Sequence, residues 1–302
     1  MRAERPGLFY FIGGKTFLPR GDSNVPPDFL GAKRDAFIDS FNEIGTTALG
    51  VSAGDLVLPL SEWERLAAKS RFPFLSTNLA PVGKSIFRSH LRIKAGDQSV
   101  LVISISNPKS ALSGEWTWRE PKEALSAIFS EQAKSVDYAV LLTDIPREQS
   151  AELARLFPKI RLVLGDEDLE PTPEEFGTLL EASTLQNQSV SSGRGLGWVD
   201  FLDGRGTVLF NAARADAQRI YQDILKSRLA ETRGLKGSDR ASMQSALARY
   251  KNIPTEYAPG MVRYEVGTVR LTPDWANPPN ALTEKVRQFK SRIREIALDS
   301  VD

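Results

Sequence analysis

Three short apolar runs constrain the fold of this chain more than any other feature. Val100–Ile105, Tyr138–Leu142 and Ile160–Leu164 are almost entirely apolar, without the alternation of a strand that has one solvent-facing side. A strand that is apolar on both faces has to be covered on both faces, by helices or by a second sheet. Strands are also expected at 8–12, 46–51 and 73–77, and we expect all six to form one layered core.

Segments with helical periodicity lie between these strands. In Ala32–Ile44 the apolar residues recur at helical spacing, and Gly45 follows as a stop signal. A second helix is expected from Ser61 through Leu66, with Ser61 as its N-cap and Glu64 completing a capping box. Two further helical patterns cover Glu120–Lys134 and Gln149–Phe157. The chain is therefore expected to have an α/β fold with a layered, α+β arrangement of its helices and sheets.

The pattern changes after Leu164. Three short strand-like segments follow, separated by turns, and we expect them to form or extend a second sheet: Phe176–Ser183, Gly195–Leu202 and Gly206–Asn211. From residue 212 onward come two polar helices, a strand at Met261–Leu271 and a terminal helix at Ala281–Leu298. We therefore predict a core domain over 1–211 and an appendage over 212–302. The appendage is small for an independent domain, so it is expected to pack on the core.

Composition excludes several classes of chemistry. The chain has 302 residues, no cysteine and a single histidine, His90. Thiolate catalysis, disulfides and a histidine-rich metal site within one subunit are therefore excluded. His90 lies between Arg88 and Arg92 on an alternating strand, where we expect a solvent-facing or core-edge residue.

The charge distribution gives no reason to expect nucleic acid as a partner. The formal net charge is +1 at pH 7, so no global field steers an anionic partner. The polar helices at 212–251 carry 9 basic and 4 acidic residues, but Tyr221 and Tyr250 are their only aromatic rings for base stacking. No run of 18 apolar residues occurs and the N-terminus lacks an apolar leader region. Neither a transmembrane segment nor a signal peptide is expected.

Several stretches resemble a known family. Gly45–Asp55, followed by Phe72-Pro-Phe-Leu-Ser-Thr-Asn78, is similar to a strand ending in G-N-H-E and then F-P-x-L-x-x-N. These motifs belong to the 5'-nucleotidase and UDP-sugar hydrolase branch of the calcineurin-like metallophosphoesterases. Val136–Asp144 and Phe157–Asp168 resemble that branch's V-D-x-x-x-x-L-[TS]-H and G-G-H-x-H stretches, and Arg263–Ile296 resembles its tail. The resemblance implies a two-sheet β-sandwich flanked by helices, with a C-terminal helical appendage.

The same resemblance implies that the family's metal site is degenerate here. The family holds two divalent metals through Asp, Asn and several His at the carboxyl ends of the central strands. The stretch Ser52–Asp55 corresponds to the family's G-N-H-E, with Ala53 and Gly54 in place of Asn and His. Acids replace the histidines of the later motifs. The position of the family's metal-bridging Asp corresponds to the region of Gly13-Gly14, which has no carboxylate, and the first D-x-H motif is absent.

Carboxylates remain just after the expected core strands. They are Asp55, Asp144, Asp166, Glu167 and Asp168. Carboxylates alone suit hard cations, so a weak site for Mg²⁺, Mn²⁺ or Ca²⁺ is one interpretation. The other is that these are solvated acids at strand ends and that the protein has no cofactor. The resemblance implies that Asp55, Asp144 and Asp166 lie together at one mouth of the core.

Three functional hypotheses follow. The first is a catalytically degenerate, 5'-nucleotidase-like protein that acts as a binding or structural component, with a protein partner. The family suggests the bacterial periplasm or envelope as its location. The second is a metal-dependent phosphoester (nucleotide) hydrolase with a non-standard carboxylate site. The third is an unrelated α/β domain whose motif likeness is accidental.

Overall fold

The computed structural model describes most of the chain. The described residues are 8–13, 16–17, 27–108, 112, 114–165, 178–181, 184–187, 195–203, 208–230, 237–250, 253–270, 283–284 and 286–291. They divide into two compact units: unit 1 comprises 1–146, 164–168 and 271–302, and unit 2 comprises 147–163 and 169–270.

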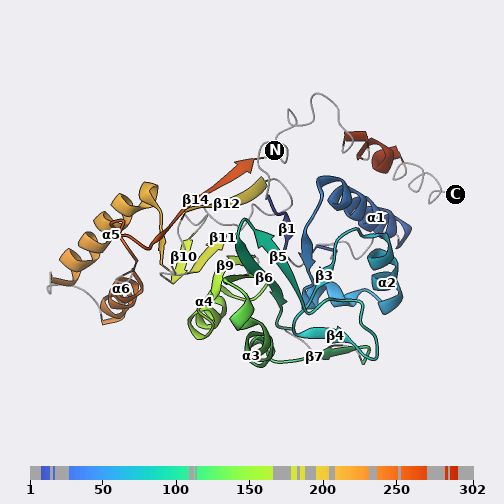
Figure 1. Cartoon of the computed structure of the whole chain (residues 1–302), viewed down its shortest axis with the longest axis horizontal. Coiled ribbons are helices and arrows are strands. Elements are labelled where there is room, and N and C mark those ends of the chain that lie inside the picture. Colours follow the sequence, from blue (N-terminus) through green and yellow to red (C-terminus); the bar gives the residue numbers. More distant parts are fainter. Residues whose placement is uncertain are drawn as a thin grey trace. The chain divides into compact units, whose positions relative to one another are not determined.

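Unit 1 holds the expected core strands of the first half of the chain (Figure 1). Its strands are β1 (Phe11–Ile12), β2 (Ala48–Gly50), β3 (Phe74–Leu75), β4 (Leu79–Pro81), β5 (His90–Ala95), β6 (Gln98–Ile105), β7 (Trp116–Trp118) and β8 (Tyr138–Thr143). Its helices are α1 (Pro27–Ile44), α2 (Leu60–Lys69) and α3 (Pro121–Gln132), with 3-10 turns η1 (Ala53–Val57) and η2 (Ala133–Ser135).

The strands of unit 1 form three groups. β1, β2 and β3 are parallel neighbours in that order. In the second group β6 lies between β5, which is antiparallel to it, and β8, which is parallel to it. β4 and β7 form a separate antiparallel ribbon. The expected core strands of unit 1 therefore lie in two groups, and every residue of β8 is buried, as its unalternating sequence predicts.

An aromatic cluster fills the core of unit 1. Trp63 is fully buried, and the rings of Phe17, Phe74 and Phe87 meet its indole edge to face at centroid distances of 5.1–5.5 Å. Phe87 in turn stacks on Trp116 at 5.8 Å. Such pairs contribute about 0.5–1.5 kcal/mol each beyond their buried area. The cluster joins α2, β3 and β7 around one anchor.

Two helix starts differ from the sequence-based expectation. α1 begins at Pro27, five residues before the expected start at Ala32, because proline is pre-organised for the first turn of a helix. α2 begins at Leu60 with Pro59 as its cap, and no side chain caps it. The predicted capping box is wrong, because Ser61 lies inside the first turn and the Glu64 carboxylate pairs with Lys84 instead.

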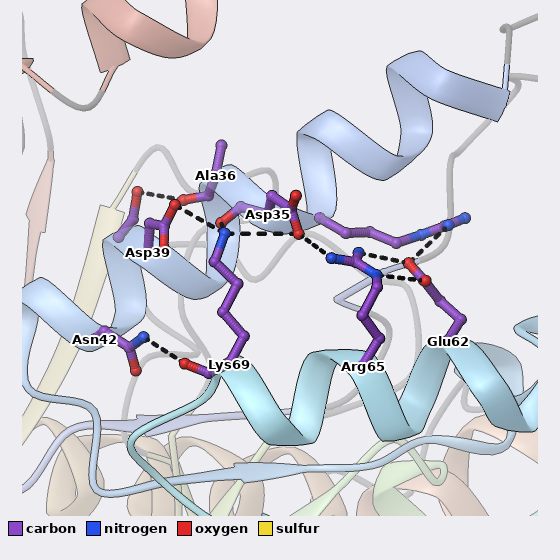
Figure 2. A network of polar contacts seen from close by, with 9 residues as sticks. Asp35, Ala36, Asp39, Asn42, Glu62, Arg65 and Lys69 are labelled. Atoms are coloured by element: carbon purple, nitrogen blue, oxygen red, sulfur yellow. Dashed lines mark hydrogen bonds and ion pairs between the residues drawn. The ribbon is translucent and has the colours of Figure 1, made fainter.

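An ion-pair network joins α1 to α2 (Figure 2). The Arg65 guanidinium donates to Asp35 at 2.5 Å and to Glu62 at 2.8 Å, and the Lys69 ammonium contacts Asp39 at 3.0 Å. The hydrogen bond from Arg65 lowers the pKa of Glu62. Asn42 closes the network by donating to the carbonyl of Lys69 at 3.1 Å. The network fixes the register of the two helices.

Unit 2 holds the remaining elements. They are α4 (Arg147–Leu156), β9 (Ile160–Leu164), β10 (Thr178–Glu181), β11 (Thr184–Asn187), β12 (Gly195–Asp203), β13 (Leu209–Phe210), α5 (Ala212–Ala230), α6 (Gly237–Tyr250) and β14 (Val262–Arg270). β10, β11 and β9 are neighbours in that order. β14 pairs antiparallel with β12 and parallel with β13.

The segment after residue 211 therefore shares a sheet with strands before it. Val262 and Tyr264 on β14 are 1% and 2% exposed. The two predicted polar helices exist as α5 and α6, and 283–284 and 286–291 of the predicted terminal helix are helical. The division into a 1–211 core and a 212–302 appendage stays a prediction. Among the described residues, no helix combines the length and apolarity that crossing a bilayer requires.

Candidate functional site

The carboxyl ends of the parallel strands in unit 1 are the candidate ligand-binding region, because ligands of such folds bind beyond the carboxyl ends of their strands. Gly50 is the last residue of β2 and lies against β6 and β8 of the second strand group. A Cβ built on Gly50 would lie 2.8 Å from Ser104 Oγ on β6 and 3.0 Å from Leu142 Cβ on β8. β2 and β8 therefore approach closely near their carboxyl ends, and Asp55 and Asp144 follow those ends.

Asp55 is fully buried and its carboxylate is occupied by the chain itself. It accepts hydrogen bonds from Phe17 N at 2.9 Å, from Ser52 Oγ at 2.8 Å and from Thr16 N at 3.4 Å. A buried carboxylate needs such donors, since leaving it unpaired in the interior is costly. Asp55 thus ties the segment that follows β1 to the end of β2.

The segment that corresponds to the family's G-N-H-E motif is a short 3-10 turn. Ser52 caps η1 by accepting from Asp55 N at 3.2 Å, and Ala53 N donates to Ser106 Oγ at 2.7 Å. Serine is a favoured cap because its oxygen satisfies a backbone donor that the helix leaves open. The polar groups here therefore stabilise the turn. Ala53 and Gly54 add no side chain that could bind a metal.

Glycines bring three chain segments together at the same end of unit 1. Gly165 has φ +106°, and a Cβ there would lie 2.0 Å from the carbonyl oxygen of Thr143. A Cβ on Gly13 would lie 4.0 Å from Gly165 Cα. Only glycine fits at Gly165, in both conformation and space. Gly13, where the sequence resemblance implies a bridging carboxylate, therefore lies beside the backbone of Gly165.

The other predicted acids are placed only in part. Asp144 directly follows β8 and is half-buried. Asp166, Glu167 and Asp168 lie outside the described residues. Within the described part of the chain, no three His, Cys, Asp or Glu side chains come together as a possible metal site. At the ligand positions that the sequence resemblance implies, the chain has Ala53, Gly54 and Gly13, and Asp55 is used internally, so these residues do not fit a two-metal centre.

His90 lies at the start of β5, opposite Ile103 of β6, and is half-buried. Its Nδ1 is 3.0 Å from Ser89 Oγ. Burial lowers the pKa of His90, and the nearby Arg92 charge lowers it further against an opposing effect of Glu131. The expectation of a core-edge histidine is confirmed.

Asn78 is a residue whose role the sequence did not reveal, although it closes the F-P-x-L-x-x-N stretch. Its amide donates to the carbonyls of Ser106 at 2.6 Å and Arg119 at 3.1 Å, and its oxygen accepts from Ser106 N at 3.1 Å. Arg119 N donates back to the Asn78 carbonyl at 2.8 Å. An amide can act as donor and acceptor at once, so this buried side chain joins the ends of β6 and β7.

Comparison with known proteins identifies the fold. No family model and no curated protein matches the sequence. Among solved structures, a 5'-nucleotidase precursor from Thermus thermophilus is 14% identical over 97% of this chain and 51% of its own, with TM-score 0.65. The calcineurin-like phosphoesterase YfkN from Bacillus subtilis is 13% identical over 98% of this chain and 86% of its own, with TM-score 0.59.

A third similar structure is the sulfate thiohydrolase SoxB from Thermus thermophilus, 21% identical over 64% of this chain, with TM-score 0.53. This chain spans only 35% of SoxB and 51% of the 5'-nucleotidase precursor. At these identities the likeness establishes the fold alone. The chain has a metallophosphoesterase-like fold, as the sequence resemblance implied.

Proposed function

We propose that this chain uses the metallophosphoesterase fold as a binding or structural component and does not hydrolyse phosphoesters. The observation that carries the proposal is the state of Asp55. Its carboxylate is fully buried and accepts from Phe17 N, Ser52 Oγ and Thr16 N, so its lone pairs serve the fold. A metal ligand has to direct its oxygens at the ion instead.

The residue types around Asp55 support the same proposal. Two-metal hydrolysis requires ligands that hold both ions and the bridging nucleophile. Ala53, Gly54 and Gly13 stand at ligand positions of the family, and the one histidine lies on β5 away from them in the sequence. Because loss of outer-shell partners alone costs about 10–100-fold in affinity or activity, loss of this many ligands leaves no measurable turnover.

A hydrolase assay tests the proposal. The purified protein is incubated with nucleoside monophosphates, UDP-sugars and an aryl phosphate, with Mn²⁺, Mg²⁺, Zn²⁺ or Ca²⁺ supplied. We expect no release of phosphate above the blank, and no stoichiometric transition metal in elemental analysis. Metal-dependent turnover that scales with protein concentration and survives repurification would overturn the proposal.

The second candidate function is a phosphoester hydrolase with an all-carboxylate site. It is favoured by the position of Asp144 directly after β8 and by the three acids that follow Gly165 in the sequence. If turnover is seen, an Asp144→Asn, Glu167→Gln double variant abolishes it under this hypothesis. Glu123→Gln, which changes an exposed acid on α3, is the matched control and leaves it unchanged.

The location and partner of the protein belong to the same proposal. A fold without its usual chemistry is retained when it contributes a surface, so we infer a protein partner, in the periplasm or envelope of a bacterium. Cell fractionation followed by crosslinking of the intact protein tests this. Recovery in the cytoplasmic fraction without a crosslinked species would contradict it.

A further inference from the structure

We propose that the groove beside the β4–β7 ribbon of unit 1 binds a sugar acid, a single pyranose ring that carries a carboxylate. The groove has a volume of about 270 Å³, which suits one sugar ring. It is formed by the loop after β3, by β4, by the turn that follows and by β7. The groove does not include Asp55 or Asp144, so the proposal does not depend on whether the ends of β2 and β8 are catalytic.

The first element of the site is an exposed aromatic ring. Trp118 lines the groove, is 43% exposed and makes no ring contact with another described aromatic residue. Trp116, two residues earlier on the same strand, is instead buried and stacks on Phe87. Exposed indole is unfavourable in water, whereas the C–H face of a pyranose can cover it and leave the sugar hydroxyls in solvent.

The second element is an arginine without a counter-ion among the described residues. Arg119 lines the groove and is exposed, and its guanidinium forms no ion pair within that part of the structure. Its neighbour Glu120 is used elsewhere, since its carboxylate accepts from Lys122 N at 2.7 Å at the start of α3. Lys84, the other cation of the groove, is paired with Glu64. One planar guanidinium matches one planar carboxylate.

The choice of a carboxylate over a phosphate follows from this count of charges. A phosphate carries nearly two negative charges and three acceptor oxygens, and its sites gather several cations or a helix N-terminus. With Lys84 paired with Glu64, Arg119 is the cation of the groove that has no ion pair among the described residues. The groove also offers the hydroxyl group of Ser85, which suits the hydroxyls of a sugar.

The third element is that the groove is held in shape by buried hydrogen bonds. Asn78 fixes both backbone groups of Arg119, because its side-chain amide donates to the Arg119 carbonyl and its own carbonyl accepts from Arg119 N. Thr77 Oγ1 donates to the Ser89 carbonyl at 2.6 Å and accepts from Ser104 N at 3.2 Å. Asn78 and Thr77 are thus positioning residues, and a site that needs no reordering loses less entropy on binding.

Titration of the full-length protein with D-glucuronate tests the proposal. Binding is measured by calorimetry or ligand-observed NMR, and D-glucose and inorganic phosphate are the comparison ligands. We expect glucuronate to bind at least 10-fold more tightly than glucose. Arg119→Gln should reduce the glucuronate affinity about 10-fold, to the level of glucose, since a charge-assisted hydrogen bond is about twice as strong as a neutral one. Trp118→Ala should weaken both sugars.

Arg88→Gln is the matched control. Arg88 is also exposed and without an ion pair among the described residues, but it does not line the groove, so the affinity should stay within twofold. Three results would each overturn the proposal: no saturable glucuronate binding at millimolar concentration, equal losses from Arg88→Gln and Arg119→Gln, or phosphate binding as tightly as glucuronate. Arg119→Gln leaves the backbone hydrogen bonds to Asn78 in place, so a normal melting temperature separates loss of binding from loss of fold.

Discussion

Replacing Asp55 with alanine tests directly whether this carboxylate serves the fold. The substitution removes the acceptor of Phe17 N and of Ser52 Oγ, two donors on residues that are 4% and 1% exposed. Each buried donor left without a partner costs about 1–3 kcal/mol. The expected loss is therefore about 2–6 kcal/mol in the free energy of unfolding, a large share of the roughly 5–15 kcal/mol of a typical protein.

The assay is urea unfolding followed by tryptophan fluorescence, with EDTA present so that no metal contributes. Glu43→Ala, an exposed acid on α1, is the control and should lie within about 0.5 kcal/mol of the unsubstituted protein. A role for Asp55 as a metal ligand makes the opposite prediction. A carboxylate reserved for an absent cation is an unfavourable buried charge, so its removal would be neutral or stabilising. A loss below about 0.5 kcal/mol for Asp55→Ala would refute our reasoning.

Three further outcomes concern stability. Arg65→Ala should cost about 0.5–1 kcal/mol at pH 7, because the network is partly exposed. Since Arg65 lowers the pKa of Glu62, this difference is present above the usual carboxyl pKa and fades as pH falls below it; urea midpoints at pH 7 and pH 3 measure it. Gly165→Ala should unfold or severely destabilise the protein, because the added Cβ would lie 2.0 Å from a backbone oxygen. Gly83→Ala is the control: Gly83 also has a positive φ, but the space around it is open, so this change should cost only about 1 kcal/mol. Thermal melts measure both. Tyr264→Phe should be neutral or stabilising, because its buried hydroxyl has no hydrogen-bond partner within the described residues and burial raises its pKa to about 12; loss of more than about 1 kcal/mol would contradict this.

The sequence alone predicted the strands of the core and indicated the fold. Tyr138–Thr143 is apolar at nearly every position. Such a strand has to be buried on both faces to keep its side chains from water, so its sequence alone predicts its place in the core. The order of motifs around Asp55, Asn78 and Asp144 then sufficed to indicate the metallophosphoesterase fold, which the solved structures confirm. Local signals and motif order are properties of the chain itself.

The tertiary structure alone decided what the polar residues of these motifs do. In the sequence, Asp55 looks like a solvated acid or a metal ligand; only the approach of Phe17, distant along the chain, makes it an internal acceptor. Asn78 ends a recognisable motif, but its partners Ser106 and Arg119 lie just beyond other strands. Hydrogen bonds between residues far apart in sequence leave no periodic signal. The groove at Trp118 was invisible for the same reason, since it exists only where β4 and β7 pair.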